Sequence, residues 1–228
     1  MADTPIRSAS TLIILRNFTS TPQVLMGQRG SKAAFMPNKF VFPGGAVDQA
    51  DSTIRLAQPL TGRCQTNLQQ DSTGPTPETL AVAAIRELWE ETGLMLGARE
   101  AWQDAPDDWA EFARAGYRPS AENMYFFFRA ITPPGAPRRF DARFFLVNAD
   151  QLSGDLDDFS NASDELSHLQ WVSLDEVRSL NLPFITSVVL GELAGITKIG
   201  APNSVPFFKN QDEESLFLRL QGLQKQDQ

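Results

Sequence analysis

Residues 79–94, TLAVAAIRELWEETGL, decide how the rest of the chain is interpreted. The first half of this segment is almost wholly apolar, which predicts a helix whose first turns are buried. The second half places Glu87, Glu90 and Glu91 at positions i, i+3 and i+4, so three carboxylates share one helix face. Like charges at this spacing repel each other, and the macrodipole disfavours anions near a helix C-terminus. Helix propensity therefore gives no reason for the cluster, whereas binding of divalent cations does.

The ends of this helix are marked by residues that suit helix termini. Thr76 is a good N-cap, Pro77 fits the first helical position, and Gly93 fits the left-handed conformation that ends a helix. The sequence thus predicts a helix over residues 77–92. An acidic helix face is most often a solvated surface, so the glutamates alone do not establish a metal site.

The composition limits the chemistry that this chain can perform. The 228 residues include 20 basic and 28 acidic side chains, and the formal charge of −8 argues against binding to a nucleic-acid duplex. The single cysteine, Cys64, and the single histidine, His168, argue against an internal disulfide, a cysteine or histidine zinc site and a Ser-His triad. Carboxylates must then carry the chemistry, and hard cations that prefer oxygen ligands are the matching cofactors.

The hydropathy pattern predicts no membrane segment. No apolar run reaches the roughly 18 residues that a spanning helix needs, and the polar start of the chain does not resemble a signal peptide. We therefore expect a cytoplasmic protein that binds neither a membrane nor a nucleic-acid duplex.

Strands and helices are mixed along the chain on both sides of the central helix. Apolar and β-branched runs predict strands at residues 10–16, 23–29, 39–42, 124–130, 143–147 and 169–172. Further helices are predicted to begin at residues 173–177 and to cover residues 183–193 and 213–223. This mixture predicts an α/β fold around one mixed sheet. Residues 1–228 are expected to form a single domain, with a polar insertion at 51–77 and a helical C-terminal extension at 178–228.

The central helix also carries a family motif. Residues 86–94, RELWEETGL, resemble the second half of the Nudix hydrolase box, R-E-U-x-E-E-x-G-U, with every specified position filled. The full box is G-x5-E-x7-R-E-U-x-E-E-x-G-U, and residues 42–45, FPGG, are similar to its opening in many members. Seven residues separate Glu78 from Arg86, as in the box, but counting from Gly45 puts the box glutamate at position 51. Since 78 − 51 gives 27, the resemblance implies 27 inserted residues in a loop before the helix.

The resemblance implies a fold, a cofactor and roles for the box residues. The fold would be a Nudix-type α/β/α sandwich with a central mixed sheet, the insertion before the catalytic helix and extra C-terminal helices. Mg²⁺ or Mn²⁺ ions would lie between substrate phosphates and the box, and a metal-bound water would attack one phosphorus of a diphosphate. Catalytic roles would fall to Arg86 and the three box glutamates. The metal ligands would be Glu87, Glu90, Glu91 and the carbonyl of Gly44, and structural support would come from Glu78 (paired with Arg86), Gly45 and Gly93.

Two further groups outside the box are candidates for the site. Glu165 lies six residues before Trp171 of a W-x-S-L strand, a spacing that resembles the auxiliary catalytic glutamate of some relatives, although a solvent-facing loop acid is the alternative. Guanidinium groups suit diphosphate oxygens, and the candidates for binding them are Arg29, Arg139 and Arg143, with Arg138 beside them. The phenylalanines of the strands around residues 124–130 and 143–147 are expected to be mostly core, with one or two able to stack on a base.

The substrate is suggested by features upstream of the box. The long insertion and residues 35–37, FMP, look similar to the Nudix branch that contains the peroxisomal coenzyme A diphosphatase. Leu25, Arg29 and the FPGG run match part of a coenzyme A signature, and the positions between them do not. Coenzyme A or acyl-CoA is therefore favoured, with the insertion as a wall of its pocket. ADP-ribose, other nucleotide sugars and dinucleoside polyphosphates stay open.

Two rival classes carry less weight. Non-catalytic Nudix-fold binding modules usually lose box carboxylates, and none is lost here. A prenyl-diphosphate isomerase of this fold needs a cysteine and metal-binding histidines, but Cys64 lies inside the insertion and His168 is the single histidine. A small nucleotide-diphosphate substrate is the expected partner, and a homodimer is possible since many relatives dimerise.

Overall fold

The computed structural model describes residues 4–33, 35–210 and 216–221. Its strands are β1 (Ile6–Arg16), β2 (Gln23–Arg29), β3 (Phe40–Val41), β4 (Gly44–Ala46), β5 (Gly97–Arg99), β6 (Tyr117–Pro119), β7 (Tyr125–Ile131), β8 (Arg139–Asn148), β9 (Leu166–Ser173), β10 (Ser204–Lys209) and β11 (Leu216–Gln221). Its α-helices are α1 (Gly62–Gln69), α2 (Pro77–Thr92), α3 (Ala110–Arg114) and α4 (Phe184–Ala194). None of the helices in these ranges is both long and apolar enough to cross a membrane.

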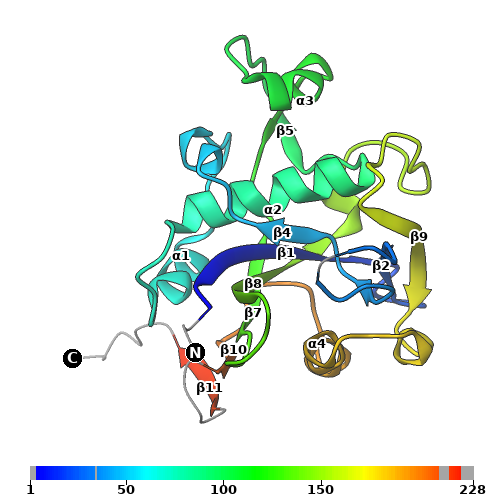
Figure 1. Ribbon diagram of the computed structural model, residues 1–228. Helices are drawn as coiled ribbons and strands as arrows, with labels where there is room; N and C mark the ends of the chain where they lie inside the picture. The colour runs from blue at the N-terminus through cyan, green and yellow to red at the C-terminus, as the bar shows by residue number, and fades with distance from the viewer. Residues whose placement is uncertain (1–3, 34, 211–215, 222–228) are drawn as a thin grey trace.

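A mixed sheet forms the centre of the molecule (Figure 1). Its strand order is β11-β10-β7-β8-β1-β2-β3, with β4 paired to β1 and β9 paired to β2. The β1–β8 and β7–β10 pairs are parallel, and the other pairs are antiparallel. The prediction of an α/β fold around one mixed sheet is confirmed.

Helices cover both faces of this sheet, and β1 supplies apolar residues to each of them. Leu12 and Ile14 pack into the core on the side of α2 and α1, whereas Ile13 and Leu15 pack on the side of α4. Successive side chains of a strand point to opposite faces, so a strand buried on both sides is continuously apolar. This explains why residues 12–15 show no polar alternation.

The central helix α2 has the ends that the sequence predicts. The side chain of Thr76 accepts a hydrogen bond from the backbone N–H of Thr79, and Pro77 is the first helical residue. Gly93 ends the helix with φ 74°, and its N–H donates to the carbonyl of Trp89. These local signals place α2 correctly because caps depend on neighbouring residues alone.

The insertion is a packed part of the fold. Cys64 and Leu68 of α1 are buried in the core on the α2 side of the sheet. After α1, Arg129 donates to the carbonyls of Gln70 and Asp71, which ties the chain to β7. A segment with buried side chains and paired backbone groups contributes to stability rather than forming a loose surface loop.

The C-terminal region differs from its prediction. The helix expected over residues 183–193 is confirmed as α4. Where a helix was expected to begin at 173–177, Ser173 instead ends β9, residues 174–176 form a turn and the short 3₁₀ helix Val177–Ser179 follows. Residues 216–221 of the helix predicted at 213–223 instead form β11, paired antiparallel to β10. Residues 213–215 and 222–223 lie outside the described ranges. The extension is thus only partly helical, because pairing with β10 fixes the extended conformation that local propensity did not indicate.

Candidate active site

The turn that enters β4 brings the backbone close to α2. A Cβ atom on Gly44, whose φ is 154°, would lie 2.6 Å from the carbonyl oxygen of Ser10. A Cβ atom on Gly45 would overlap the carboxylate of Glu87. Because glycine lacks this atom, the acidic side chains of α2 can lie directly against the strand. The backbone N–H of Gly44 donates to Oε2 of Glu91 at 2.8 Å, which joins the turn to the helix.

The three glutamates of α2 lie at different depths. Glu91 is 2% exposed and Glu87 is 9% exposed, whereas Glu90 is exposed at the surface. Burial raises the pKa of Glu91 to about 8, against the lowering effect of the Gly44 N–H. Burial raises the pKa of Glu87 to about 7, against the lowering effect of Arg86, and it also raises the pKa of Glu90. Two poorly solvated carboxylates beside a third form a site that favours a cation.

Arg86 holds this acidic face together. Its Nη1 donates to Glu87 Oε1 at 2.9 Å and to Glu90 Oε2 at 3.0 Å. Its Nε donates to Asp51 Oδ1 at 2.8 Å, and its Nη2 reaches Asp51 Oδ2 and the carbonyl of Ala46. Burial alone would lower the pKa of Arg86, but these carboxylates raise it above its ordinary value. The guanidinium therefore stays charged and fixes two of the three glutamates.

Asp51 takes the role that the sequence assigned to Glu78. Asp51 is 2% exposed and forms the pair with Arg86, whereas Glu78 lies in the first turn of α2, eight positions or about 12 Å of helix away. Asp51 is also the position that counting from Gly45 gives to the box acid. Asp51 and Arg86 are 35 positions apart, and 35 − 8 again gives 27 inserted residues. The insertion thus follows the acid of the box, and the support role of Glu78 is wrong.

The donor set suits a hard divalent cation. The groups available are carboxylate oxygens next to a glycine turn that leaves space beside them, which is the chemistry that Mg²⁺ and Mn²⁺ prefer. Within the described ranges, however, no three acidic, histidine or cysteine side chains converge as a ready metal site. The reason is visible in the contacts, because Arg86 holds Glu87 and Glu90 while the Gly44 N–H holds Glu91. The residues therefore fit the ion chemically, and their side chains must turn to ligate it.

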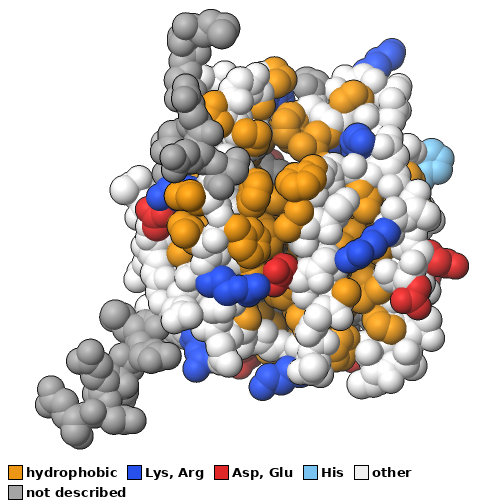
Figure 2. Space-filling view, turned by 90° about the horizontal axis from the view of Figure 1, so that it is seen from below, with side chains coloured by type: hydrophobic (Ala, Val, Ile, Leu, Met, Phe, Trp, Pro, Cys, Tyr) orange, Lys and Arg blue, Asp and Glu red, His pale blue; other side chains and the backbone are white. Residues whose placement is uncertain are grey.

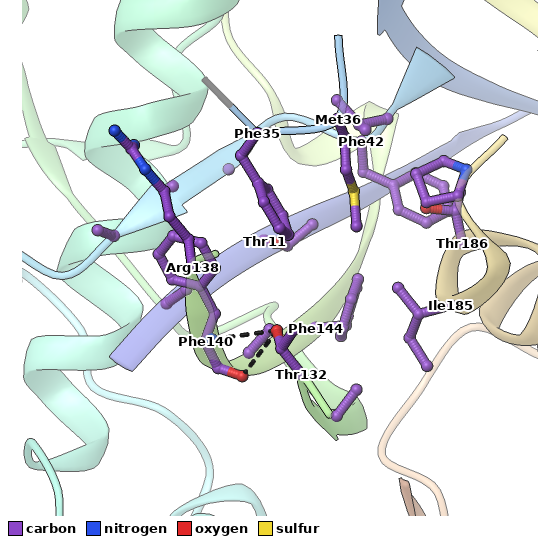
Figure 3. A pocket seen from close by; sticks show the side chains of 18 of the residues that line it. Thr11, Phe35, Met36, Phe42, Thr132, Arg138, Phe140, Phe144, Ile185 and Thr186 are labelled. Atoms are coloured by element: carbon purple, nitrogen blue, oxygen red, sulfur yellow. Dashed lines mark hydrogen bonds between the residues drawn. The ribbon is translucent and has the colours of Figure 1, made fainter. Parts of the chain in front are cut away.

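A cavity of about 790 Å³ opens beside the glutamates. Figure 2 shows the face that carries α4, where apolar side chains gather around a hollow. Gly44, Gly45, Glu87 and Glu90 line one part of the cavity. Figure 3 shows its apolar part, where the labelled side chains come from the segments on either side of β3, from β1, from the β7–β8 connection, from β8 and from the start of α4. Those with apolar groups are Phe35, Met36, Phe42, Phe140, Phe144 and Ile185. The acidic face of α2 thus opens into a space large enough for a small organic molecule.

Comparison with known proteins agrees with this geometry. The model of the NUDIX domain matches residues 74–189, a little more than half of the chain. The chain belongs to the Nudix family.

Relatives and solved structures of Nudix proteins resemble the chain beyond the motif. It is 30% identical over 183 residues to a Caenorhabditis elegans protein named "Putative nudix hydrolase 7", covering 75% of this chain and 52% of that protein. It is 30% identical over 102 residues to the Xenopus laevis "Acyl-coenzyme A diphosphatase NUDT19", covering 36% of this chain and 27% of that protein. The chain thus spans about half or less of the length of these curated relatives. The crystal structure of a NUDIX hydrolase from Alicyclobacillus acidocaldarius matches with a TM-score of 0.62 at 26% identity, covering 86% of this chain and 99% of that one.

Glu165 is brought to the Nudix box by the fold. It lies just before β9 and lines the cavity together with Glu87 and Glu90. Its negative charge is among the causes that raise the pKa values of Glu87, Glu90 and Glu91. Its place at the site agrees with the sequence analysis, whereas its catalytic role stays a prediction.

The arginines expected to bind substrate separate into two groups. Arg29 lines the cavity, and its Nε donates to the carbonyl of Phe35. Arg139 and Arg143 are each 1% exposed and do not line it. Arg139 donates to the carbonyls of Thr132 and Asn210. Arg143 pairs with Asp141, and burial lowers its pKa to about 10. The prediction that Arg139 and Arg143 contact substrate is therefore wrong, because both are used in packing the sheet.

Two cavity residues complete the comparison with the sequence analysis. Arg138 lines the cavity as its neighbourhood suggested, and Arg7 of β1 was not anticipated. Arg7 lies on the same face of β1 as Ala9 and Thr11, which also line the cavity, because alternate residues of a strand share a face. The sequence gives this shared face, but it does not say which face of the strand carries the site.

No residue from 51–77 lines the cavity, so the expectation that the insertion walls the pocket is wrong. The insertion packs against α2 on the other side of the sheet.

Proposed function

We propose that this chain is a divalent-metal-dependent hydrolase that cleaves the diphosphate linkage of a nucleoside diphosphate joined to another moiety. The observation that carries the proposal is that Glu87 and Glu91 lie against the Gly44–Gly45 turn while Glu87 and Glu90 line the cavity. Carboxylates at this spacing destabilise a helix unless a cation joins them. Retention of the whole set argues against a binding module that has lost its chemistry.

Each residue of the site has a role that follows from its position. Glu87, Glu90, Glu91 and the carbonyl of Gly44 would hold Mg²⁺ or Mn²⁺, which when bound supplies an activated water and neutralises phosphoryl charge. Arg86, fixed by Asp51, donates to one oxygen of Glu87 and one of Glu90, so it would support these two ligands while the other oxygen of each carboxylate turns to the ion. Gly45 keeps the space open in which the Glu87 carboxylate lies.

Proton transfer and phosphate binding fall to residues outside the box. Glu165 is exposed, lines the cavity and comes from a different element, so it can accept a proton from the attacking water. Arg7, Arg29 and Arg138 line the cavity and can donate to diphosphate oxygens. The catalytic acids and the phosphate-binding arginines would then act on the substrate from different walls.

Coenzyme A or an acyl-CoA is the substrate that we favour. The Xenopus relative carries the name of an acyl-coenzyme A diphosphatase, and the partial upstream signature around Leu25 and Arg29 supports the same class. The apolar part of the cavity suits a substrate that joins a diphosphate to an organic arm. ADP-ribose, other nucleotide sugars and dinucleoside polyphosphates are the alternatives that an experiment must separate.

The test is a substrate panel with metal controls. Purified protein is incubated with coenzyme A, ADP-ribose or diadenosine tetraphosphate, with Mg²⁺, with Mn²⁺ or with a chelator, and the products are separated. We expect coenzyme A to yield 3′-phosphoadenosine 5′-phosphate and 4′-phosphopantetheine, because attack falls on the diphosphate, and we expect the chelator to stop the reaction. Faster hydrolysis of ADP-ribose would refute the substrate and leave the diphosphatase standing. No hydrolysis of any compound with either metal would refute the enzyme.

A further inference from the structure

The floor of the cavity is made by small side chains that are in register across the sheet. Four neighbouring strands each contribute one alanine to a continuous row that begins beside Gly45, and all four alanines line the cavity. In spatial order they are Ala46 of β4, Ala9 of β1, Ala142 of β8 and Ala130 of β7. Phe208 of β10 is the register partner of Ala130 and ends the row. Strands lie about 4.8 Å apart, so the four steps from β4 to β10 span about 19 Å.

Aromatic side chains form walls on both sides of this row. Thr11 and Phe144 are register partners next to the alanines, and the ring of Phe144 meets the ring of Phe42 at 6.4 Å. On the other side, the ring of Phe140 meets the ring of Phe35 at 5.3 Å. Edge contacts of this kind fix the orientation of aromatic rings. The alanine row with these walls is a narrow channel within the cavity, called here the alanine channel.

The far end of the alanine channel is apolar and open. Phe208 contacts Phe184 at a ring distance of 6.0 Å and Phe217 at 6.3 Å. Phe184 begins α4 and is 70% exposed, although it is a large apolar side chain. Exposed apolar groups that continue a cavity usually mark a place where a ligand adds its own apolar surface.

The charged groups that line the cavity lie outside the strands and the helix at the far end of the alanine channel. Of the described residues that line it, none contributed by β7, β10 or α4 carries a charge. The polar groups there are few and partly used, because the Thr132 hydroxyl bonds to Phe140 and the Asn210 amide donates to the carbonyl of Ile131. A sugar ring, with a hydroxyl group on nearly every carbon, would leave more polar groups without partners on this floor than a flexible chain whose polar groups are separated by methylene and methyl groups.

From these observations we infer that the alanine channel binds a long, flexible arm, with methylene and methyl groups between its polar groups, on the far side of the substrate's diphosphate. The inference rests on the proposed diphosphatase function and names the group that follows the scissile bond. Ala142, in the middle of the row, then determines specificity, because a larger side chain there closes the channel beyond the glutamates. Phe184 contacts only arms long enough to leave the channel.

The decisive variant is Ala142→Leu. Ala142 is partly exposed in the cavity, so a leucine side chain can project into the channel while the Nudix box stays intact. We expect kcat/KM for coenzyme A and for octanoyl-CoA to fall at least tenfold, and kcat/KM for ADP-ribose, which has no such arm, to change less than twofold. The matched control is Ala115→Leu, the same change at an exposed position after α3 and outside the cavity, which should leave all three values unchanged. Ala142→Val replaces the leucine variant if its thermal midpoint drops.

Phe184→Ala tests the outer end of the channel separately. This side chain is largely exposed, so its removal should not unfold the protein. We expect a loss of about threefold or more for octanoyl-CoA and no loss for coenzyme A. An equal loss for both compounds would contradict the assigned place of Phe184.

Binding measurements separate this inference from the proposed function. The dissociation constants of coenzyme A and ADP-ribose are measured calorimetrically without metal, and Ala142→Leu should raise only that of coenzyme A, about tenfold. If the wild-type protein cleaves nothing but this binding pattern is found, the hydrolase proposal fails and the channel stands. Equal effects of Ala142→Leu on both ligands, or no effect on either, would overturn the channel.

Discussion

The two faces of the central sheet are built from the same strands, but one is closed by packed helices and the other has an open cavity. On the α2 face, Leu12 and Ile14 of β1 are fully buried under α2, and α1 and the insertion close the remaining space. On the α4 face, Ile13 and Leu15 are buried near α4, but Ala9 and Thr11 line an open cavity. The difference lies in side-chain size and helix coverage. Both faces carry a buried core, but only the α4 face leaves a cavity, and Glu87 and Glu90 of α2 line it beside the glycine turn.

The glutamates should show the largest effect on activity without a loss of stability. Replacing Glu90 or Glu91 by glutamine removes an anionic ligand but keeps size and helix propensity. We expect kcat to fall by orders of magnitude while the thermal midpoint does not fall below that of the wild type. Glu78→Gln, the same change in the first turn of α2, is the matched control and should keep wild-type turnover. Near-native turnover of both site variants would show that the cluster is only a solvated face.

A change on the α2 face of the sheet should show the reverse pattern, a loss of stability with no change in KM. Leu68 of α1 is buried in the core on the α2 side, so Leu68→Ala leaves a cavity and should lower the free energy of unfolding by about 2–5 kcal/mol. Because the insertion lines no part of the cavity, KM for coenzyme A and for ADP-ribose should stay unchanged in the folded fraction. Denaturant unfolding and initial rates check the two halves of this prediction. A selective rise of KM for coenzyme A would restore the insertion as a wall of the pocket.

Asp51 should matter for turnover where Glu78 does not. Asp51→Asn removes the charge that fixes Arg86, and loss of a residue that orients metal ligands typically costs about 10- to 100-fold in activity or metal affinity. The metal concentration for half-maximal activity should rise together with the fall in kcat. If Glu78→Gln has the larger effect and Asp51→Asn is silent, the box acid is Glu78 after all.

The smallest expected effect is the pH dependence of stability without metal. Burial raises the folded-state pKa values of Glu87 and Glu91 from 4.5 to about 7 and about 8. A carboxyl group with a raised pKa favours the folded state while it is protonated, so this contribution is full below about pH 4.5 and is lost as the pH rises through 7 and 8. In a chelator, the thermal midpoint should therefore decline from pH 5 to pH 8, and Glu91→Gln should flatten the decline. Parallel curves for both proteins would contradict the raised pKa of Glu91.

Features that depend on neighbours along the chain could be determined from the sequence by itself. The cap at Thr76, the stop at Gly93 and the spacing of Glu87, Glu90 and Glu91 fix α2 and its acidic face. Residues 42–45 mark the turn that meets this face, and apolar runs mark β1, β2 and α4. These signals act within one or two turns of backbone, so no tertiary contact is needed to recognise them.

Tertiary structure alone decided which acid supports Arg86, which arginines reach the cavity and how the chain ends. Glu78 fits the count back from Arg86 and Asp51 fits the count forward from Gly45, so spacing alone does not choose between them, and the contact with Arg86 does. Arg139 and Arg143 look like surface cations until the sheet buries them, and β11 becomes a strand through its pairing with β10. The alanine channel exists only because four strands align in register. Burial, strand pairing and register depend on contacts between segments that are far apart in the sequence. Local propensity therefore does not predict them.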